Sequence, residues 1–208
     1  MNWKPALFAL PLFLTGCVQS MFYYPDRVRY ETPKALGLRY EAVQFQSGDG
    51  TRLSGWFIPA ADRQSPKDAK GTVVHFHGNA QNMSSHWRFV AWLPAQDFNV
   101  FVFDYRGYGE SEGKPEPKGV FEDSNAALDH VRSRPDVDPE RLLLIHGTED
   151  PVIPHSHSRR LLDAAREPKR LVEVAGAGHL EPMTERFGTT YQRALVEFFD
   201  ASLRPRQP

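Results

Sequence analysis

The feature that most constrains the fold is a set of short, continuously apolar runs separated by segments with helical periodicity. The runs lie at residues 72–76, 100–103, 142–145 and 171–174. Apolar runs of this length without polar alternation are typical of strands buried on both faces of a parallel sheet. The segments between them favour helices, so the chain alternates strand and helix. This order predicts an α/β sheet with right-handed crossover connections.

The remaining expected elements complete one domain. Two alternating segments, 40–46 and 53–58, flank the Gly-Asp-Gly turn at 48–50 and predict a β-hairpin. Helices are expected at residues 86–95, 119–131, 156–165 and 191–201. The predicted fold class is a mostly parallel, doubly wound α/β sheet that begins with an N-terminal hairpin.

The first residues have the pattern of an export signal. Lys4 precedes an apolar run at 6–14, and Leu-Thr-Gly-Cys at 14–17 ends it. The run is too short to span a bilayer and indicates a secretory signal. Its end resembles the lipobox of a bacterial lipoprotein signal, which implies cleavage before Cys17 and acylation of that residue. A plain signal peptide or an uncleaved apolar terminus are the alternatives.

We therefore expect a signal peptide over residues 1–16, a membrane-proximal segment over 17–39 and a single domain over 40–203. Val18 follows the cysteine where an aspartate would be expected for inner-membrane retention. In lipoproteins this points to the outer membrane, with the domain facing the periplasm. The membrane is thus an expected partner, through lipidated Cys17.

Composition excludes several classes of site. The formal net charge of -1 gives no electrostatic case for nucleic acid, and a single cysteine allows neither a disulfide framework nor a cysteine-rich zinc site. His75 and His77 alternate along a strand, but no acid or cysteine is suitably spaced to complete a metal site. We assign both histidines structural roles and expect no metal and no cofactor.

Four motifs follow predicted strands in a fixed order. They are HGNA at 77–80, DYRGYG at 104–109, HGTEDPVIP at 146–154 and GH at 178–179. Together they resemble the α/β-hydrolases of the serine-aminopeptidase-like or dienelactone-hydrolase-like branch, over about residues 22–203. The resemblance implies that the backbone N–H of Asn79 contributes to an oxyanion hole.

The same resemblance implies a catalytic acid and base. His179 would be the general base and Asp150 would hold its tautomer, in ester, thioester or amide hydrolysis through an acyl-enzyme. Asp150 could instead cap a helix beginning near Pro154, and a lone histidine is usually structural. His179 follows Asp150 by 29 residues (179 minus 150) with the strand 171–174 between them, which favours the catalytic pairing.

The nucleophile is not found. In this family a serine sits on the nucleophile elbow, a sharp strand-to-helix turn of the form Gly-x-Ser-x-Gly. Residues 109–113 match those letters, with Ser111 at the centre. Ser111 lies several residues beyond the strand end, and Pro115 and Pro117 delay any helix. We therefore expect Ser111 to be a structural loop residue.

The chain is also too short for a complete site. Only 46 residues separate Asp104 from Asp150 (150 minus 104), and the helix at 119–131 uses much of that length. Each further strand-helix-strand unit needs roughly 30 residues. An internal deletion near Leu144, either in the gene itself or in the assignment of its coding sequence, would have removed the elbow, the adjoining helix, the next strand and any lid. It would leave a shortened central sheet. A natural pseudo-hydrolase is the alternative.

Two functional hypotheses follow. The first is a lipid-anchored hydrolase-family protein, catalytically impaired, whose parent substrate is a small-molecule or peptide acyl compound. The second is a non-catalytic envelope lipoprotein that binds a partner. A serine that becomes covalently modified would discriminate between them.

Overall fold

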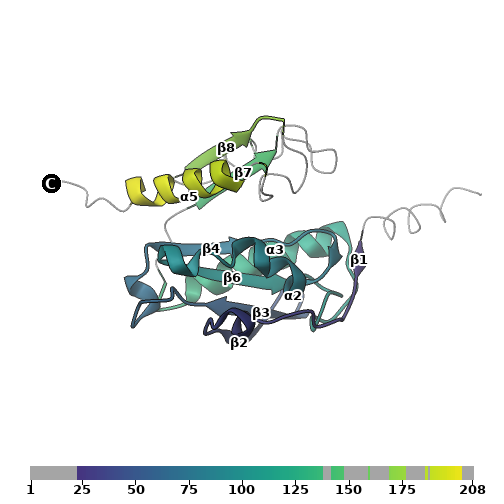
Figure 1. Ribbon diagram of the computed structural model, residues 1–208. Coiled ribbons are helices and arrows are strands. Elements are labelled where there is room, and N and C mark those ends of the chain that lie inside the picture. Colours follow the sequence, from purple (N-terminus) through teal and green to yellow (C-terminus); the bar gives the residue numbers. More distant parts are fainter. Residues whose placement is uncertain are drawn as a thin grey trace, which may run out of the picture.

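The computed structural model describes residues 23–137, 142–147, 169–176 and 188–202, together with Arg159 and Arg186. Its main sheet has four strands in the order β2-β3-β6-β4 (Figure 1). The pairs β2–β3 and β3–β6 are antiparallel, whereas β4 and β6 are parallel. The strands are β2 (Glu41–Gln46), β3 (Arg52–Ile58), β4 (Gly71–His75) and β6 (Phe98–Asp104).

Two smaller parallel pairs accompany this sheet. One consists of β7 (Leu142–Gly147) and β8 (Lys169–Val174), and the other of β1 (Tyr24–Pro25) and β5 (Ala80–Gln81). The predicted hairpin and all four buried runs are thus strands. The short β1–β5 pair has no counterpart in the sequence prediction, because two residues are too few to show a periodicity.

Two of the predicted helices are confirmed, and the prediction of one continuous helix over 86–95 is wrong. The confirmed helices are α3 (Pro117–Ser133) and α5 (Gly188–Ser202). In place of one helix over 86–95 there are three short pieces, α2 (Met83–His86), η3 (Trp87–Val90) and η4 (Pro94–Gln96). Pro94 has no N–H to continue an α-helix, and Asp97 adopts a left-handed φ of 76° that turns the chain into β6. Of the helix expected at 156–165, all but Arg159 lies outside the described residues.

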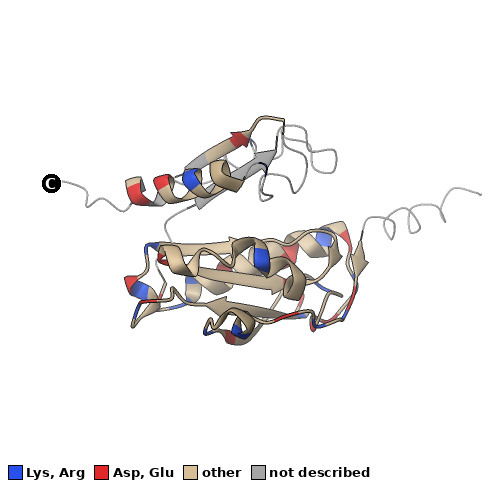
Figure 2. Cartoon of the chain, viewed as in Figure 1, with Lys and Arg blue, Asp and Glu red and all other residues tan. Residues whose placement is uncertain are grey.

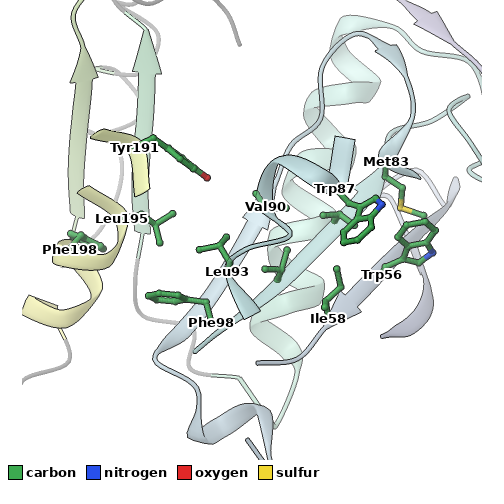
Figure 3. Packing of buried hydrophobic residues seen from close by; sticks show 12 residues of the cluster. Trp56, Ile58, Met83, Trp87, Val90, Leu93, Phe98, Tyr191, Leu195 and Phe198 are labelled. Atoms are coloured by element: carbon green, nitrogen blue, oxygen red, sulfur yellow. The ribbon is translucent and has the colours of Figure 1, made fainter. Parts of the chain in front are cut away.

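Helices cover both faces of the sheet. On one face Val100 and Val102 of β6 pack with residues of α2, η3 and α5, where Tyr191 and Leu195 point toward Val90 and Leu93 (Figure 3). On the other face Phe101 and Phe103 pack with the hairpin and with Ala127 and Val131 of α3. Because alternate residues of a strand point to opposite faces, β6 is buried on both, as a doubly wound α/β fold requires.

Strand β4 departs from its sequence prediction. Thr72, Val73 and Val74 are only half-buried, although they were expected to be buried on both faces. The reason is that, within the described part of the chain, β4 pairs on one side only, with β6, and so forms an edge of the sheet. The predicted fold class holds, with the central sheet shortened at this edge.

Charges are spread over the surface. In Figure 2 basic and acidic residues are interspersed along the helices and loops, while the strands of the main sheet are almost free of both. Over the ranges that the structure describes, no helix is both long enough and apolar enough to cross a membrane.

Candidate active-site loops

The loop after β4 carries Asn79, the expected oxyanion donor, and hydrogen bonds fix its backbone. The N–H of Gly78 donates to Nδ1 of His86 at 3.0 Å, and the carbonyl of Gly78 lies 2.7 Å from Nδ1 of His77. The carbonyl of Asn79 accepts from the N–H of Tyr24 and from the hydroxyl of Tyr108, both at 2.8 Å. Successive peptide groups are therefore held by different elements. The role of the Asn79 N–H stays a prediction.

Asp104, at the end of β6, holds this loop through contacts of its carboxylate group. Its Oδ1 accepts from the N–H of Met83 at 2.6 Å and lies 3.3 Å from Nε2 of His77, and the side chains of Asp104 and His77 are almost completely buried. Gly109 has a φ of 49°, and a Cβ there would collide with the Asp104 carboxylate. The carboxylate thus joins the loop after β4 to the loop after β6.

The three histidines near this loop, His75, His77 and His86, are buried or half-buried and contact neighbouring groups. Burial lowers the pKa of His75 to about 3, with repulsion from His77 and His86 adding to the effect. Burial and His77 lower the pKa of His86 to about 4, against a smaller opposing effect of Asp104. His86 is therefore neutral near pH 7 and can accept the Gly78 hydrogen bond. The ring of His77 packs against Tyr105, with 4.7 Å between the ring centres. These contacts agree with the structural roles expected for His75 and His77.

Ser111 is a structural residue, as predicted. Its side chain is completely buried, and its Oγ donates to the carbonyl of Asp104 at 2.7 Å while accepting from the N–H of Ser54 at 3.0 Å. Both hydrogen-bonding functions of the hydroxyl are in use, and a substrate carbonyl has no access to it. The Gly-x-Ser-x-Gly match at 109–113 is therefore not a nucleophile elbow.

Arg106 fixes the other side of the same loop. Its guanidinium group forms ion pairs with Asp123 on α3 and with Asp49 in the hairpin turn, each at 2.9 Å. The backbone N–H of Arg106 also donates to Asp123, at 2.8 Å. Gly119 permits this arrangement, because a Cβ at that position would collide with the guanidinium. The Arg-Gly-Tyr-Gly sequence thus builds a rigid loop.

The remaining predicted site residues, Cys17, Asp150 and His179, lie outside the described residues. The two strands that lead to the acid and the base are described. They pair in parallel from Leu142 opposite Lys169 to Gly147 opposite Val174, so their carboxyl ends are neighbours. Asp150 follows one end by three residues and His179 follows the other by five. Their meeting at this edge stays a prediction.

Two features of the site were missed at the level of sequence. The first is the segment 23–30, which pairs through Tyr24 with Ala80 and reaches the loop that carries Asn79. The second is His86, whose ring accepts the Gly78 hydrogen bond. Both depend on contacts between residues far apart in sequence, and no local pattern announces them.

Comparison with known proteins identifies the family. A family model described as serine aminopeptidase S33 matches residues 67–140. The uncharacterised protein YfhR of Escherichia coli K12 is 34% identical, with 90% of this chain and 89% of the relative covered. The α/β-hydrolase domain-containing protein WAV2 of Arabidopsis thaliana is 40% identical over 114 residues, which are 54% of this chain and 36% of the relative. This chain belongs to the α/β-hydrolase family.

Solved structures agree on the fold of this α/β-hydrolase. The Pyrococcus furiosus esterase Pf2001 superposes with a TM-score of 0.60, covering 86% of this chain and 98% of the esterase at 17% identity. A hypothetical protein, PA2218 of Pseudomonas aeruginosa, superposes equally well at 15% identity. At such identities the likeness extends to the fold alone.

The alignment with YfhR has more positions than this chain has residues. It runs over 257 positions, whereas 90% of 208 residues is about 187. Roughly 70 positions (257 minus 187) therefore have no residue of this chain opposite the relative. The WAV2 match is different, because 54% of 208 residues is about 112, nearly all of its 114 positions.

Proposed function

We propose that this chain is a lipid-anchored member of the α/β-hydrolase family that lacks its nucleophile elbow and is catalytically impaired. The observation that carries the proposal is the deficit of roughly 70 positions within the alignment to YfhR, an alignment that spans 89% of that relative. A deficit of that size corresponds to about two strand-helix units. The space between Asp104 and Asp150 is too short by a similar amount.

The sheet supports the same proposal. In the family that the chain resembles, the elbow follows the strand after the helix ending near Arg134. In this molecule that strand is β7, which pairs with β8, while β4 has no second neighbour in the described part of the chain. The main sheet therefore stops where a further parallel strand would be added.

The chemistry left to such a chain is limited. Ser111 has a buried, fully bonded hydroxyl. With no serine to acylate, His179 could at most activate a water molecule beside the Asn79 N–H. Serine hydrolases without their catalytic residues retain about 10³- to 10⁴-fold acceleration over water, far below a complete site. Any residual substrate would be an acyl compound.

A covalent probe tests the proposal. The full chain is treated with a fluorophosphonate, with the Pyrococcus furiosus esterase Pf2001 as the positive control, and we expect labelling of the esterase only. A chimera carrying the missing segment of YfhR between Leu144 and Ile145 should recover labelling. Recovery should be lost again when His179→Ala is added, because the probe needs an activated serine. Labelling of any serine in the unmodified chain, above all Ser111, would refute the proposal.

The lipid anchor is tested separately. The proposal rests on the Leu-Thr-Gly-Cys sequence at 14–17, and Cys17→Ser should abolish both acylation and membrane fractionation. Mass spectrometry of the mature N-terminus provides the direct measurement. Equal partitioning of the wild type and the variant would refute the anchor while leaving the elbow argument intact.

The second candidate, a non-catalytic envelope lipoprotein, is favoured by one observation. The loop that carries Asn79 is held by Tyr24, Tyr108, His77 and His86, none of which is a predicted catalytic residue. Its shape therefore does not depend on an intact catalytic site. Such a loop can present a constant surface to a partner even when no reaction occurs.

A further inference from the structure

The exposed apolar side chains are concentrated near the N-terminus. Six large hydrophobic residues are exposed in the described part of the chain, and four of them lie in residues 23–40, here called the N-terminal arm. They are Tyr24, Val28, Tyr30 and Leu36, with exposed fractions between 44% and 58%. Single exposed apolar residues are common, but four within 13 positions form an unusual concentration.

The arm also has unbalanced positive charge. Arg27 and Lys34 are exposed and make no side-chain hydrogen bond or ion pair with the described residues. Four basic residues, Arg27, Arg29, Lys34 and Arg39, stand in the arm against two acids, Asp26 and Glu31, and Glu31 is paired with Arg88 outside the arm. Along the arm, exposed cations therefore alternate in sequence with exposed aromatic and aliphatic side chains.

The apolar side chains of the arm are exposed although hydrogen bonds hold the backbone of the arm against the domain. The Val28 carbonyl accepts from the Asn82 side chain at 2.8 Å, and the Tyr30 N–H donates to the Ser84 hydroxyl at 3.0 Å. The Asp26 carbonyl accepts from the Gly109 N–H at 2.8 Å. These bonds fasten the arm along the loops after β4 and β6, beginning at β1 (Figure 1). The apolar side chains thus remain outside although the backbone is well bonded.

The chain length places this surface near the anchor. Tyr24 follows Cys17 by seven residues (24 minus 17), which span at most about 25 Å when fully extended. If Cys17 is acylated, as proposed above, the start of the arm is restricted to that distance from the lipid surface. Tyrosine is favoured at the interface of a bilayer, and cations there are attracted by anionic headgroups.

We propose that the N-terminal arm lies on the surface of an anionic bilayer and turns the Asn79 loop toward it. The inference rests on the proposed lipid anchor. It goes beyond that anchor, because acylation alone would leave the domain free to rotate on its tether. The link to the loop is direct, since the Tyr24 N–H donates to the Asn79 carbonyl. Contact of the arm with lipid therefore fixes the direction in which the loop faces.

Fluorescence quenching tests the orientation. The acylated full chain is reconstituted into vesicles of phosphatidylethanolamine and phosphatidylglycerol, after Val28→Cys or Leu36→Cys is introduced and labelled with bimane. Acylation consumes the thiol of Cys17, the single native cysteine, so the new thiol is the only one free to react. Gln192→Cys, exposed on α5, is the matched control.

We expect lipids carrying a doxyl quencher to reduce the emission of both arm labels at least threefold more than that of the Gln192 label. The difference should shrink in phosphatidylcholine vesicles and when Arg27→Gln and Lys34→Gln are combined, because both changes remove the electrostatic attraction. Equal quenching at the arm and at Gln192 would overturn the inference.

Two further outcomes are distinguishable. Shielding of the arm labels in native membranes but not in pure lipid would mean that a protein covers the arm, and the inference would be wrong. Absence of acylation on Cys17 by mass spectrometry would refute the proposed anchor, and with it this membrane-contact surface. Equal quenching with acylation intact would refute the surface alone.

Discussion

Replacement of Ser111 by alanine is expected to destabilise the fold without changing its reactivity. The Ser111 hydroxyl donates to the Asp104 carbonyl and accepts from the Ser54 N–H, and the side chain has no exposed surface. Alanine removes both hydrogen bonds and leaves a buried donor and a buried acceptor without that partner. A catalytic serine would show the opposite result, with lost reactivity and little change in stability.

The magnitude follows from these two groups. A buried polar group that loses its partner costs about 1–3 kcal/mol. The Asp104 carbonyl has a second lone pair and ends a strand that pairs with β3. The cost of removing its hydrogen bond from Ser111 therefore falls at the lower end of this range. We therefore expect Ser111→Ala to lower the free energy of unfolding by about 2–4 kcal/mol. For a chain of this size each kcal/mol shifts the melting temperature by about 2–4 °C.

Urea unfolding followed by circular dichroism provides the measurement. Ser133→Ala is the matched control, because within the described ranges the exposed Ser133 hydroxyl bonds only to the nearby His130 carbonyl, at 2.8 Å. We expect its effect to stay within about 0.5 kcal/mol. A loss below 0.5 kcal/mol for Ser111→Ala, or disappearance of a fluorophosphonate signal that the wild type gives, would refute the structural role of Ser111.

Two further predictions concern the loops around Asp104. Gly109→Ala should lower the free energy of unfolding by more than about 2 kcal/mol, because Gly109 has a positive φ and the new methyl group would collide with the Asp104 carboxylate. Gly48→Ala is the control, because a methyl group there meets open space and should change the free energy of unfolding little. Equal effects of the two variants in urea unfolding would contradict the steric argument. Acid should also destabilise the protein. The pKa values of His86 and His75 are lowered to about 4 and 3 in the fold, so the unfolded chain binds more protons below pH ~6.5. Stability should be retained above that pH and fall progressively toward pH 4, and His86→Gln should make this slope shallower. An unchanged slope in urea titrations between pH 7 and pH 4 would show that His86 is not neutral in the fold.

The sequence predicted the parts of the fold that have a local signature. The run at 100–103 and the helical periodicity at 119–131 each correspond to an observed element, β6 and α3. Ser111 was also assigned correctly, because the prolines after it are incompatible with an immediate helix. Such features depend on composition and spacing within a few turns or strands.

Long-range features were not accessible in the same way. The helix expected over 86–95 breaks at Pro94, a local signal that the periodicity argument overlooked, whereas the left-handed φ of Asp97 that turns the chain into β6 has no such signal. The half-exposure of β4 depends on which strands are its neighbours, and a continuous apolar run does not specify them. The attachment of Tyr24 to the Asn79 loop joins residues more than fifty positions apart.

The two edges of the main sheet differ in how well they resist self-association. Strand β2 alternates polar and apolar residues and begins with Glu41, as is usual for an edge strand. Strand β4 reads Gly-Thr-Val-Val-His, with no charge and no proline, and its outer backbone groups have no strand beside them in the described part of the chain. Such an edge is a template on which another extended chain can add. Self-association of this α/β-hydrolase should therefore begin at β4 and not be set by its net charge.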